Sequence, residues 1–154
     1  KMHDVKGAEM TKQILRRLKF DNDTINKVVK LVQYHDYRMP AEAKNVRRAM
    51  NKIGEDLFPY YLEVRKADTL AQSEYMQKEK LQNIEDVKVC YEEILKRQEC
   101  VSLKNLAITG SDLIANGMQP GKEIGEVLDK LLELVIEHPE YNAKDTLLNM
   151  KDKL

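Results

Sequence analysis

The sequence predicts an all-α protein made of two small helical subdomains joined by a long helix, with no sheet. Apolar residues recur at the i, i+3, i+4 and i+7 spacing of one helix face, and no segment alternates polar and apolar residues strongly enough to indicate a strand. Only 6 glycines and 4 prolines occur in 154 residues, which argues against the many turns of a β-protein.

Four helices are expected in residues 1–72, the first predicted domain. Their apolar faces lie in residues 5–19, 22–35, 42–53 and 58–70. Asn22 or Asp23 is a suitable N-cap for the second helix, and Gly54 is expected to end the third. Three cations come at the end of the first helix, where they complement its dipole: Arg16, Arg17 and Lys19.

The second predicted domain, residues 73–154, begins with the longest helical pattern of the chain. That pattern covers residues 74–100 and is expected to connect the two halves. Four of the 6 glycines then fall within residues 106–132. A helix is expected from residue 122 onward, because one apolar face is formed by Ile124, Val127, Leu128, Leu131 and Val135. A closing helix is expected over residues 143–150.

The turn before residue 122 is a candidate phosphate site. Pro120 cannot continue a preceding helix, and Gly121 lets the backbone turn before a new helix begins. The first turn of that helix presents free backbone N–H groups and the positive end of the helix dipole, which together attract phosphate. The candidate RNA-binding residues of this region are Gly110, Gly121, Lys122 and Gly125. In the alternative interpretation, the glycines only let two helices pack closely.

A second candidate site lies on the third helix. Its basic stripe follows the i, i+3, i+4 and i+7 spacing and consists of Lys44, Arg47 and Arg48 with Asn51. We expect this stripe to face solvent, opposite the apolar side of the helix. Residues 1–50 carry 12 Lys and Arg against 6 Asp and Glu, so the net charge of zero hides a basic N-terminal third. The stripe is suited to RNA phosphates, and the alternative is a solvated charged face.

The sequence disfavours several classes of protein. No apolar run approaches the roughly 18–20 residues of a membrane span, so we expect no membrane partner and a cytoplasmic protein. Cys90 and Cys100 would lie roughly 15 Å apart on one helix, too far for a disulfide. No Ser-His-Asp set, phosphate-binding loop or zinc spacing occurs, so no catalytic residue is assigned. The chain opens directly into helical sequence without a leader, which indicates a fragment of a longer protein.

Residues 105–115, NLAITGSDLIA, resemble the C-terminal signature of bacterial CCA-adding tRNA nucleotidyltransferases and the related poly(A) polymerases. The likeness continues in GMQPG at 117–121, EIG at 123–125 and PEYN at 139–142. It implies a body and tail that hold tRNA by its phosphates and 2′-hydroxyl groups. It also implies that catalysis, with Mg²⁺, CTP and ATP, belongs to an N-terminal domain missing from this chain, and that the fragment itself holds no cofactor. Whether the parent adds CCA, CC or A stays open.

A further resemblance concerns HD-superfamily domains. Residues 3–9, HDVKGAE, resemble the start of the third conserved helix of that superfamily, residues 34–36, YHD, the end of its next helix, and residues 66–68, KAD, its final acidic ligand. The residual metal positions implied are His3, His35 and Asp68. We expect no bound metal, because the family's earlier His and central His-Asp pair are missing and a hydrolytic site needs enough fixed ligands to activate water. The competing interpretations are a truncated HD phosphohydrolase and a helical adaptor that binds protein through its acidic C-terminal half.

Overall fold

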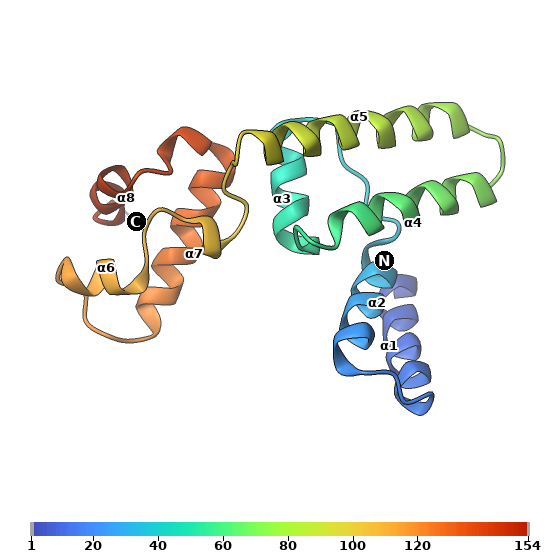
Figure 1. Cartoon of the computed structure of the whole chain (residues 1–154), viewed down its shortest axis with the longest axis horizontal. Helices are drawn as coiled ribbons and strands as arrows, with labels where there is room; N and C mark the ends of the chain where they lie inside the picture. The colour runs from blue at the N-terminus through green and yellow to red at the C-terminus, as the bar shows by residue number, and fades with distance from the viewer. Residues whose placement is uncertain (1, 154) are drawn as a thin grey trace. The chain divides into compact units, whose positions relative to one another are not determined.

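The computed structural model describes residues 2–153, with side chains from Val5 onward, and in these residues it shows eight α-helices, two short 3-10 helices and no strand (Figure 1). The all-α prediction is confirmed for this part of the chain. The α-helices are α1 (Met2–Arg17), α2 (Asn22–Tyr34), α3 (Ala43–Ile53), α4 (Phe58–Ala71), α5 (Gln77–Lys96), α6 (Gly110–Ala115), α7 (Lys122–Glu137) and α8 (Lys144–Lys151). The 3-10 helices are η1 (Leu103–Asn105) and η2 (Pro139–Tyr141). Two compact units, Lys1–Tyr91 and Glu92–Leu154, divide within α5.

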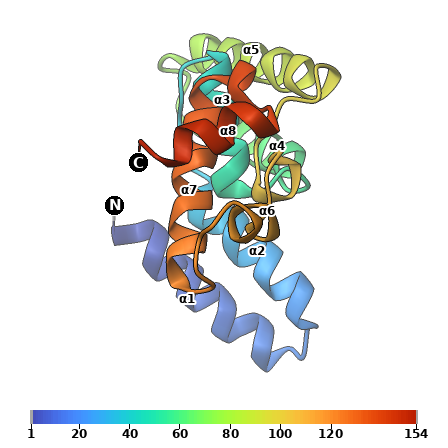
Figure 2. The same cartoon turned by 90° about the vertical axis from the view of Figure 1, so that its left-hand side faces the viewer.

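In the first unit, α1 and α2 form a hairpin whose helices lie side by side in both views (Figures 1 and 2), and α2 also contacts α3 and α4. The N-cap of α2 is Asp21, whose carboxylate accepts a hydrogen bond from the backbone N–H of Thr24 at 2.9 Å. The predicted caps, Asn22 and Asp23, are therefore wrong. A capping side chain must stand just outside the helix to reach the N–H groups of the first turn, and both residues already lie inside it.

The core of the first unit is built mainly by α3 and α4. Its buried apolar side chains are Val46, Ala49, Met50 and Ile53 from α3, Phe58, Tyr61 and Leu62 from α4, and Ile84 and Val87 from α5. Gly54 ends α3 as predicted, with a φ of 101° and its N–H donating to the Met50 carbonyl at 2.8 Å. Phe58 stacks on Tyr91 with ring centroids 5.1 Å apart. Full burial of each large apolar side chain stabilises the fold by roughly 1.5–3 kcal/mol.

A buried polar network fixes the loop that leads into α3. The Tyr61 hydroxyl donates to the Tyr37 carbonyl at 2.5 Å, and the Asn83 amide donates to the Met39 carbonyl at 3.3 Å. Between them, the buried Arg65 guanidinium donates to the Tyr61 hydroxyl and to the Asn83 carbonyl oxygen, each at 3.4 Å. Burial raises the pKa of Tyr61 to about 12. The hydroxyl therefore stays protonated and able to donate.

The second unit is organised around α7, which contacts α6, α8 and both 3-10 helices. Its buried cluster contains Cys100, Leu106, Ile108, Leu113, Leu131, Leu132, Val135, Ile136 and Leu147. Gly117 ends α6 with a φ of 89°, a conformation that favours glycine, and the next N–H, of Met118, donates to the Leu113 carbonyl at 3.0 Å. This tight turn returns the chain toward the start of α7.

Candidate nucleic-acid interface

The predicted basic stripe of α3 reaches solvent only in part. Lys44 is exposed and Arg48 is half-buried, but Arg47 is only 5% exposed. The prediction that the stripe faces solvent is therefore wrong for Arg47. This residue lies one turn before the buried Met50, so it falls within the wide buried face of α3. Arg47, Arg48 and Asn51 all have interaction partners within the structure, which leaves Lys44 as the exposed cation of the stripe.

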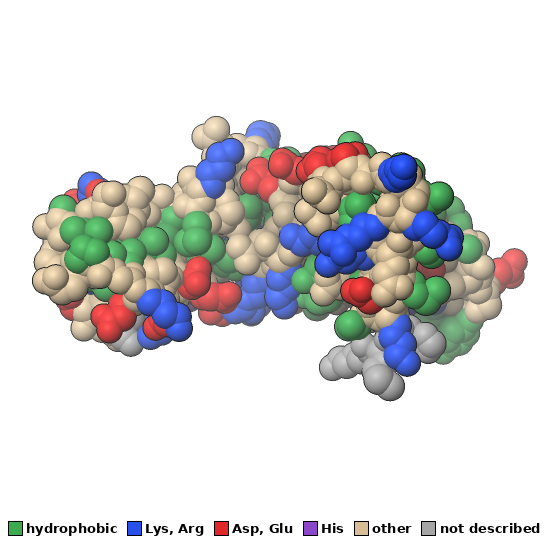
Figure 3. All heavy atoms as spheres, turned by 90° about the horizontal axis from the view of Figure 1, so that it is seen from below, with side chains coloured by type: hydrophobic (Ala, Val, Ile, Leu, Met, Phe, Trp, Pro, Cys, Tyr) green, Lys and Arg blue, Asp and Glu red, His purple; other side chains and the backbone are tan. Residues whose placement is uncertain are grey.

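Exposed cations do gather on the first unit. Figure 3 shows Lys and Arg side chains clustered over this unit, on the right of the view. The exposed cations between residues 5 and 52 are Lys6, Arg16, Arg17, Lys19, Lys27, Arg38, Lys44 and Lys52. Lys27 pairs with Asp23 at 2.6 Å and Arg38 with Asp36 at 3.0 Å, which neutralises two of them. The others give this unit a basic surface suited to polyanions.

His35 and Asp68 line one pocket between α2 and α4, whose other walls are apolar: Val28, Leu31, Val32, Val64, Ala67 and Ala71. Both side chains already have a partner, because His35 Nδ1 lies 2.6 Å from the Val32 carbonyl oxygen and the Asp68 carboxylate accepts from Gln72 at 2.7 Å. The side chain of His3 lies outside the described residues. Among the residues that the structure describes, no three His, Cys, Asp or Glu side chains are grouped to hold a metal ion. The structure thus brings together two of the three predicted positions.

The glycines of the second unit have different surroundings. A Cβ added to Gly121 or Gly125 would meet nothing within 4 Å, whereas one added to Gly110 would lie 3.1 Å from Ile124 Cγ2. Gly121 is the N-cap of α7, and no side chain caps the N–H groups that follow it. The Lys122 side chain is 92% exposed, but its ammonium lies 3.4 Å from Glu126. The backbone at Gly121 is open beside the free N–H groups of the first turn of α7, whereas Gly125 already lies inside the helix and Gly110 permits close packing of α6 on α7.

The chain matches the family described as tRNA nucleotidyltransferase domain 2 over residues 3–150. It belongs to the tRNA nucleotidyltransferase family. It is 32% identical over 136 residues to a CC-adding tRNA nucleotidyltransferase of Thermus thermophilus, covering 88% of this chain and 29% of the relative. It is 30% identical over 132 residues to an A-adding tRNA nucleotidyltransferase of Deinococcus radiodurans, covering 85% of this chain and 30% of the relative. The chain thus spans about three tenths of the length of these relatives. No solved structure matches it.

Residues 105–115 are held in place by side chains that sequence reasoning did not single out. Thr109 and Asp112 form a capping box at the start of α6, and the Asp112 carboxylate also binds Lys144. Asn142 accepts a hydrogen bond from the Ala107 N–H at 2.8 Å and donates to the Asn105 carbonyl at 3.0 Å. The T-x-x-D spacing of the capping box is visible in the sequence. The Asn142 bridge has no local signal.

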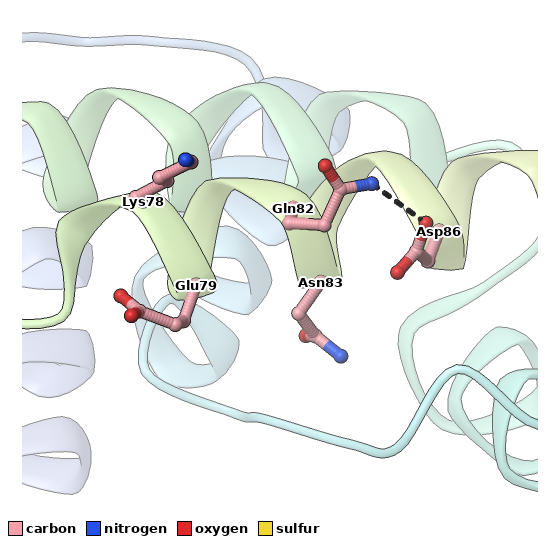
Figure 4. Close-up of a pocket in the computed structure, with 5 residues that line it drawn as sticks. All are labelled: Lys78, Glu79, Gln82, Asn83 and Asp86. Atoms are coloured by element: carbon pink, nitrogen blue, oxygen red, sulfur yellow. Dashed lines mark hydrogen bonds between the residues drawn. The ribbon is translucent and has the colours of Figure 1, made fainter.

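A polar pocket on α5 of the tRNA nucleotidyltransferase domain was also missed (Figure 4). It is lined by Lys78, Glu79, Gln82, Asn83 and Asp86. Gln82 donates to Asp86 at 2.9 Å, and Asn83 belongs to the network that fixes the loop before α3. The mixed charges provide no concentrated positive field for phosphate. No helix of residues 2–153 combines the length and the apolar character that crossing a bilayer requires.

Proposed function

We propose that this chain is the RNA-holding body and tail of a tRNA nucleotidyltransferase, with tRNA as its partner. The observation that carries the proposal is a family match that covers residues 3–150 rather than a single motif. One relative is named for adding CC to tRNA and the other for adding A. The pair supports a tRNA substrate and is compatible with a parent that adds CC, A or CCA.

In this proposal the chain holds tRNA by its backbone. Double-helical RNA has a deep, narrow major groove that side chains cannot read, so phosphates and 2′-hydroxyl groups are the accessible features. The uncapped first turn of α7 offers backbone N–H groups beside Gly121, and the first unit offers exposed cations such as Lys44. Such contacts recognise the shape and charge of the RNA rather than its sequence.

Nucleotide transfer is assigned in this proposal to a catalytic domain of the longer protein, which would use Mg²⁺ with CTP and ATP in the cytoplasm. Mg²⁺ is held by carboxylate and phosphate oxygens in near-octahedral geometry. Among the described side chains, no three His, Cys, Asp or Glu residues are grouped to hold a metal ion. No chemical step is assigned to them.

The proposal is tested by binding of the full-length protein to a tRNA transcript that lacks its 3′-terminal CCA, followed by fluorescence anisotropy over about 50–200 mM KCl. We expect log affinity to fall linearly with log salt concentration, because bound phosphates release counterions. Absence of tRNA binding, or binding that does not respond to salt, would overturn the proposal.

Two substitutions at Gly121 test the α7 turn. Gly121→Val adds bulk at a position where a Cβ has room, and Gly121→Ser supplies a hydroxyl that caps the N–H groups. Both should weaken tRNA binding several-fold. Because Ser is a good N-cap, Gly121→Ser should keep the helix intact, as circular dichroism would show. Ser111→Val, at an exposed position of α6, is the matched control. Unchanged affinity in both Gly121 variants would make the turn purely structural.

A further inference from the structure

The tip of the α1–α2 hairpin is closed by a lysine in a conformation that favours glycine. The Lys19 N–H donates to the Arg16 carbonyl at 3.0 Å and the Phe20 N–H donates to the Leu15 carbonyl at 3.1 Å, the paired bonds of a Schellman turn. Lys19 occupies the left-handed position of that turn, with a φ of 60°. Glycine adopts this conformation at no steric cost, so folding alone would favour glycine at position 19. The chain instead has a positively charged lysine there.

The same tip combines cations with exposed apolar side chains. Arg16, Arg17 and Lys19 are exposed, and none has an ion-pair partner among the described side chains, residues 5–153. Leu18 is 59% exposed and Phe20 is 49% exposed. We refer to residues 16–20 as the hairpin tip.

The acidic residues nearest in sequence do not neutralise the hairpin tip. No Asp or Glu occurs between Glu9 and Asp21. The Asp21 carboxylate is held by Thr24, through the backbone N–H at 2.9 Å and the hydroxyl at 2.6 Å. Asp23 pairs with Lys27 at 2.6 Å. The positive charge of the tip therefore remains available to a partner from solution.

We propose that the hairpin tip binds unpaired nucleotides of RNA, with Arg16, Arg17 and Lys19 on phosphates and the Phe20 ring stacked on a base. Exposed aromatic rings beside cations are the usual means of holding unpaired nucleotides, since every base offers a π-face and every nucleotide a phosphate. The inference rests on the proposed function. It extends that function from backbone contacts on duplex RNA to a single-stranded segment.

A structural role for these cations has a different consequence. Arg16 and Arg17 lie in the last turn of α1, where positive charge also stabilises the helix dipole. If that were their entire role, neutralising them would lower helix stability and leave RNA affinity unchanged. Lys19→Gly separates the two roles, because it removes a charge while supplying the residue that the left-handed turn favours.

The test measures binding of the full-length protein to a tRNA transcript and to a fully paired RNA hairpin of the same length closed by a minimal loop. Lys19→Gly should lower the log–log salt slope by about one, and Arg16→Gln with Arg17→Gln by about two more. Phe20→Leu should weaken tRNA binding by about fivefold or more, and Phe20→Trp should retain it. The loss caused by Phe20→Leu should be much smaller with the paired hairpin, which offers no extended run of unpaired bases.

The charge control is the triple variant Lys78→Gln, Lys88→Gln and Lys96→Gln, which removes three exposed cations of α5. An equal loss in that variant would assign the effect to net charge and overturn the inference. The inference is also overturned if the hairpin-tip variants bind tRNA as tightly as the wild-type protein. In that case the proposed function still stands, provided that the Gly121 variants bind tRNA more weakly. Failure of the wild-type protein to bind tRNA overturns both. If the wild-type protein binds phosphatidylserine vesicles, and the hairpin-tip variants lose that binding but keep tRNA binding, the tip is assigned to a membrane surface instead.

Discussion

The Lys144 ammonium lies 2.5 Å from a carboxylate oxygen of Asp112. Lys144 begins α8 and Asp112 lies in the first turn of α6, so this ion pair joins two helices that are distant in the chain. The other carboxylate oxygen accepts from the N–H and hydroxyl of Thr109. The bond from Lys144, followed by those from Thr109, lowers the pKa of Asp112 to about 2.

This ion pair predicts an acid-dependent stability. The folded-state pKa of Asp112 lies below the ordinary 3.8, so the stabilisation is complete above that value and is lost as pH falls toward about 2. We expect Asp112→Asn to lower the urea midpoint at about pH 6 and to lose most of this difference near pH 2. Asp129→Asn, at an exposed acid of α7, is the control. If the urea midpoints of the wild-type protein and Asp112→Asn differ equally at both pH values, the acid dependence does not come from the Asp112–Lys144 ion pair.

Two glycines should respond in opposite ways to alanine. Gly110→Ala places a Cβ 3.1 Å from Cγ2 of Ile124, a stiff β-branched side chain, so we expect a loss of about 1–3 kcal/mol in the free energy of unfolding. Gly125→Ala meets open space inside α7 and should gain about 0.5–1 kcal/mol. Chemical denaturation measures both. Equal effects would mean that close packing of α6 on α7 is not what requires Gly110.

Arg47 and Lys44 should separate stability from binding. Arg47→Ala removes a buried, partnered side chain and should cost about 1–3 kcal/mol of stability. Lys44→Ala is exposed and should change stability by less than about 0.5 kcal/mol, yet lower the salt slope of tRNA binding by about one. Chemical denaturation measures the stability of both variants, and fluorescence anisotropy measures the salt slope of their tRNA binding. If Arg47→Ala leaves stability unchanged and lowers the salt slope of tRNA binding, the original prediction that Arg47 faces solvent and contacts RNA would be supported.

We expect no tightly bound divalent metal at His3, His35 and Asp68. His35 and Asp68 share a mainly apolar pocket and each already contacts a neighbour on its own segment. His35→Ala and Asp68→Ala should each leave the metal content of the purified protein unchanged by elemental analysis. A stoichiometric metal that Asp68→Ala removes would revive the phosphohydrolase interpretation.

Most helices were predictable because apolar periodicity is a local signal: seven of the eight α-helices of residues 2–153 lie in segments that carry it, and the short α6 was not predicted. How much of each helix is buried was not predictable. Arg47 has the same spacing as Lys44 and Arg48, but tertiary neighbours widened the buried face of α3 to include it. The sequence also could not separate the two glycines that were both predicted to contact phosphate. Gly110 is the first residue of α6 and its Cα faces Ile124, whereas Gly121 stands before α7 with open space beside it.

Asn142 bonds to residues 35 and 37 positions earlier in the chain, so these two hydrogen bonds can form only after Asn142 has emerged from the ribosome. At about 5–20 residues per second, synthesis from Asn105 to Asn142 takes roughly 2–7 s. During that interval the hydrogen bonds of Asn142 are absent, and the apolar residues Leu106, Ile108 and Leu113 of the nascent chain can be bound by chaperones. A premature stop just before Asn142 removes this bridge together with α8 and its buried Leu147, and should therefore yield a product that cellular proteases remove.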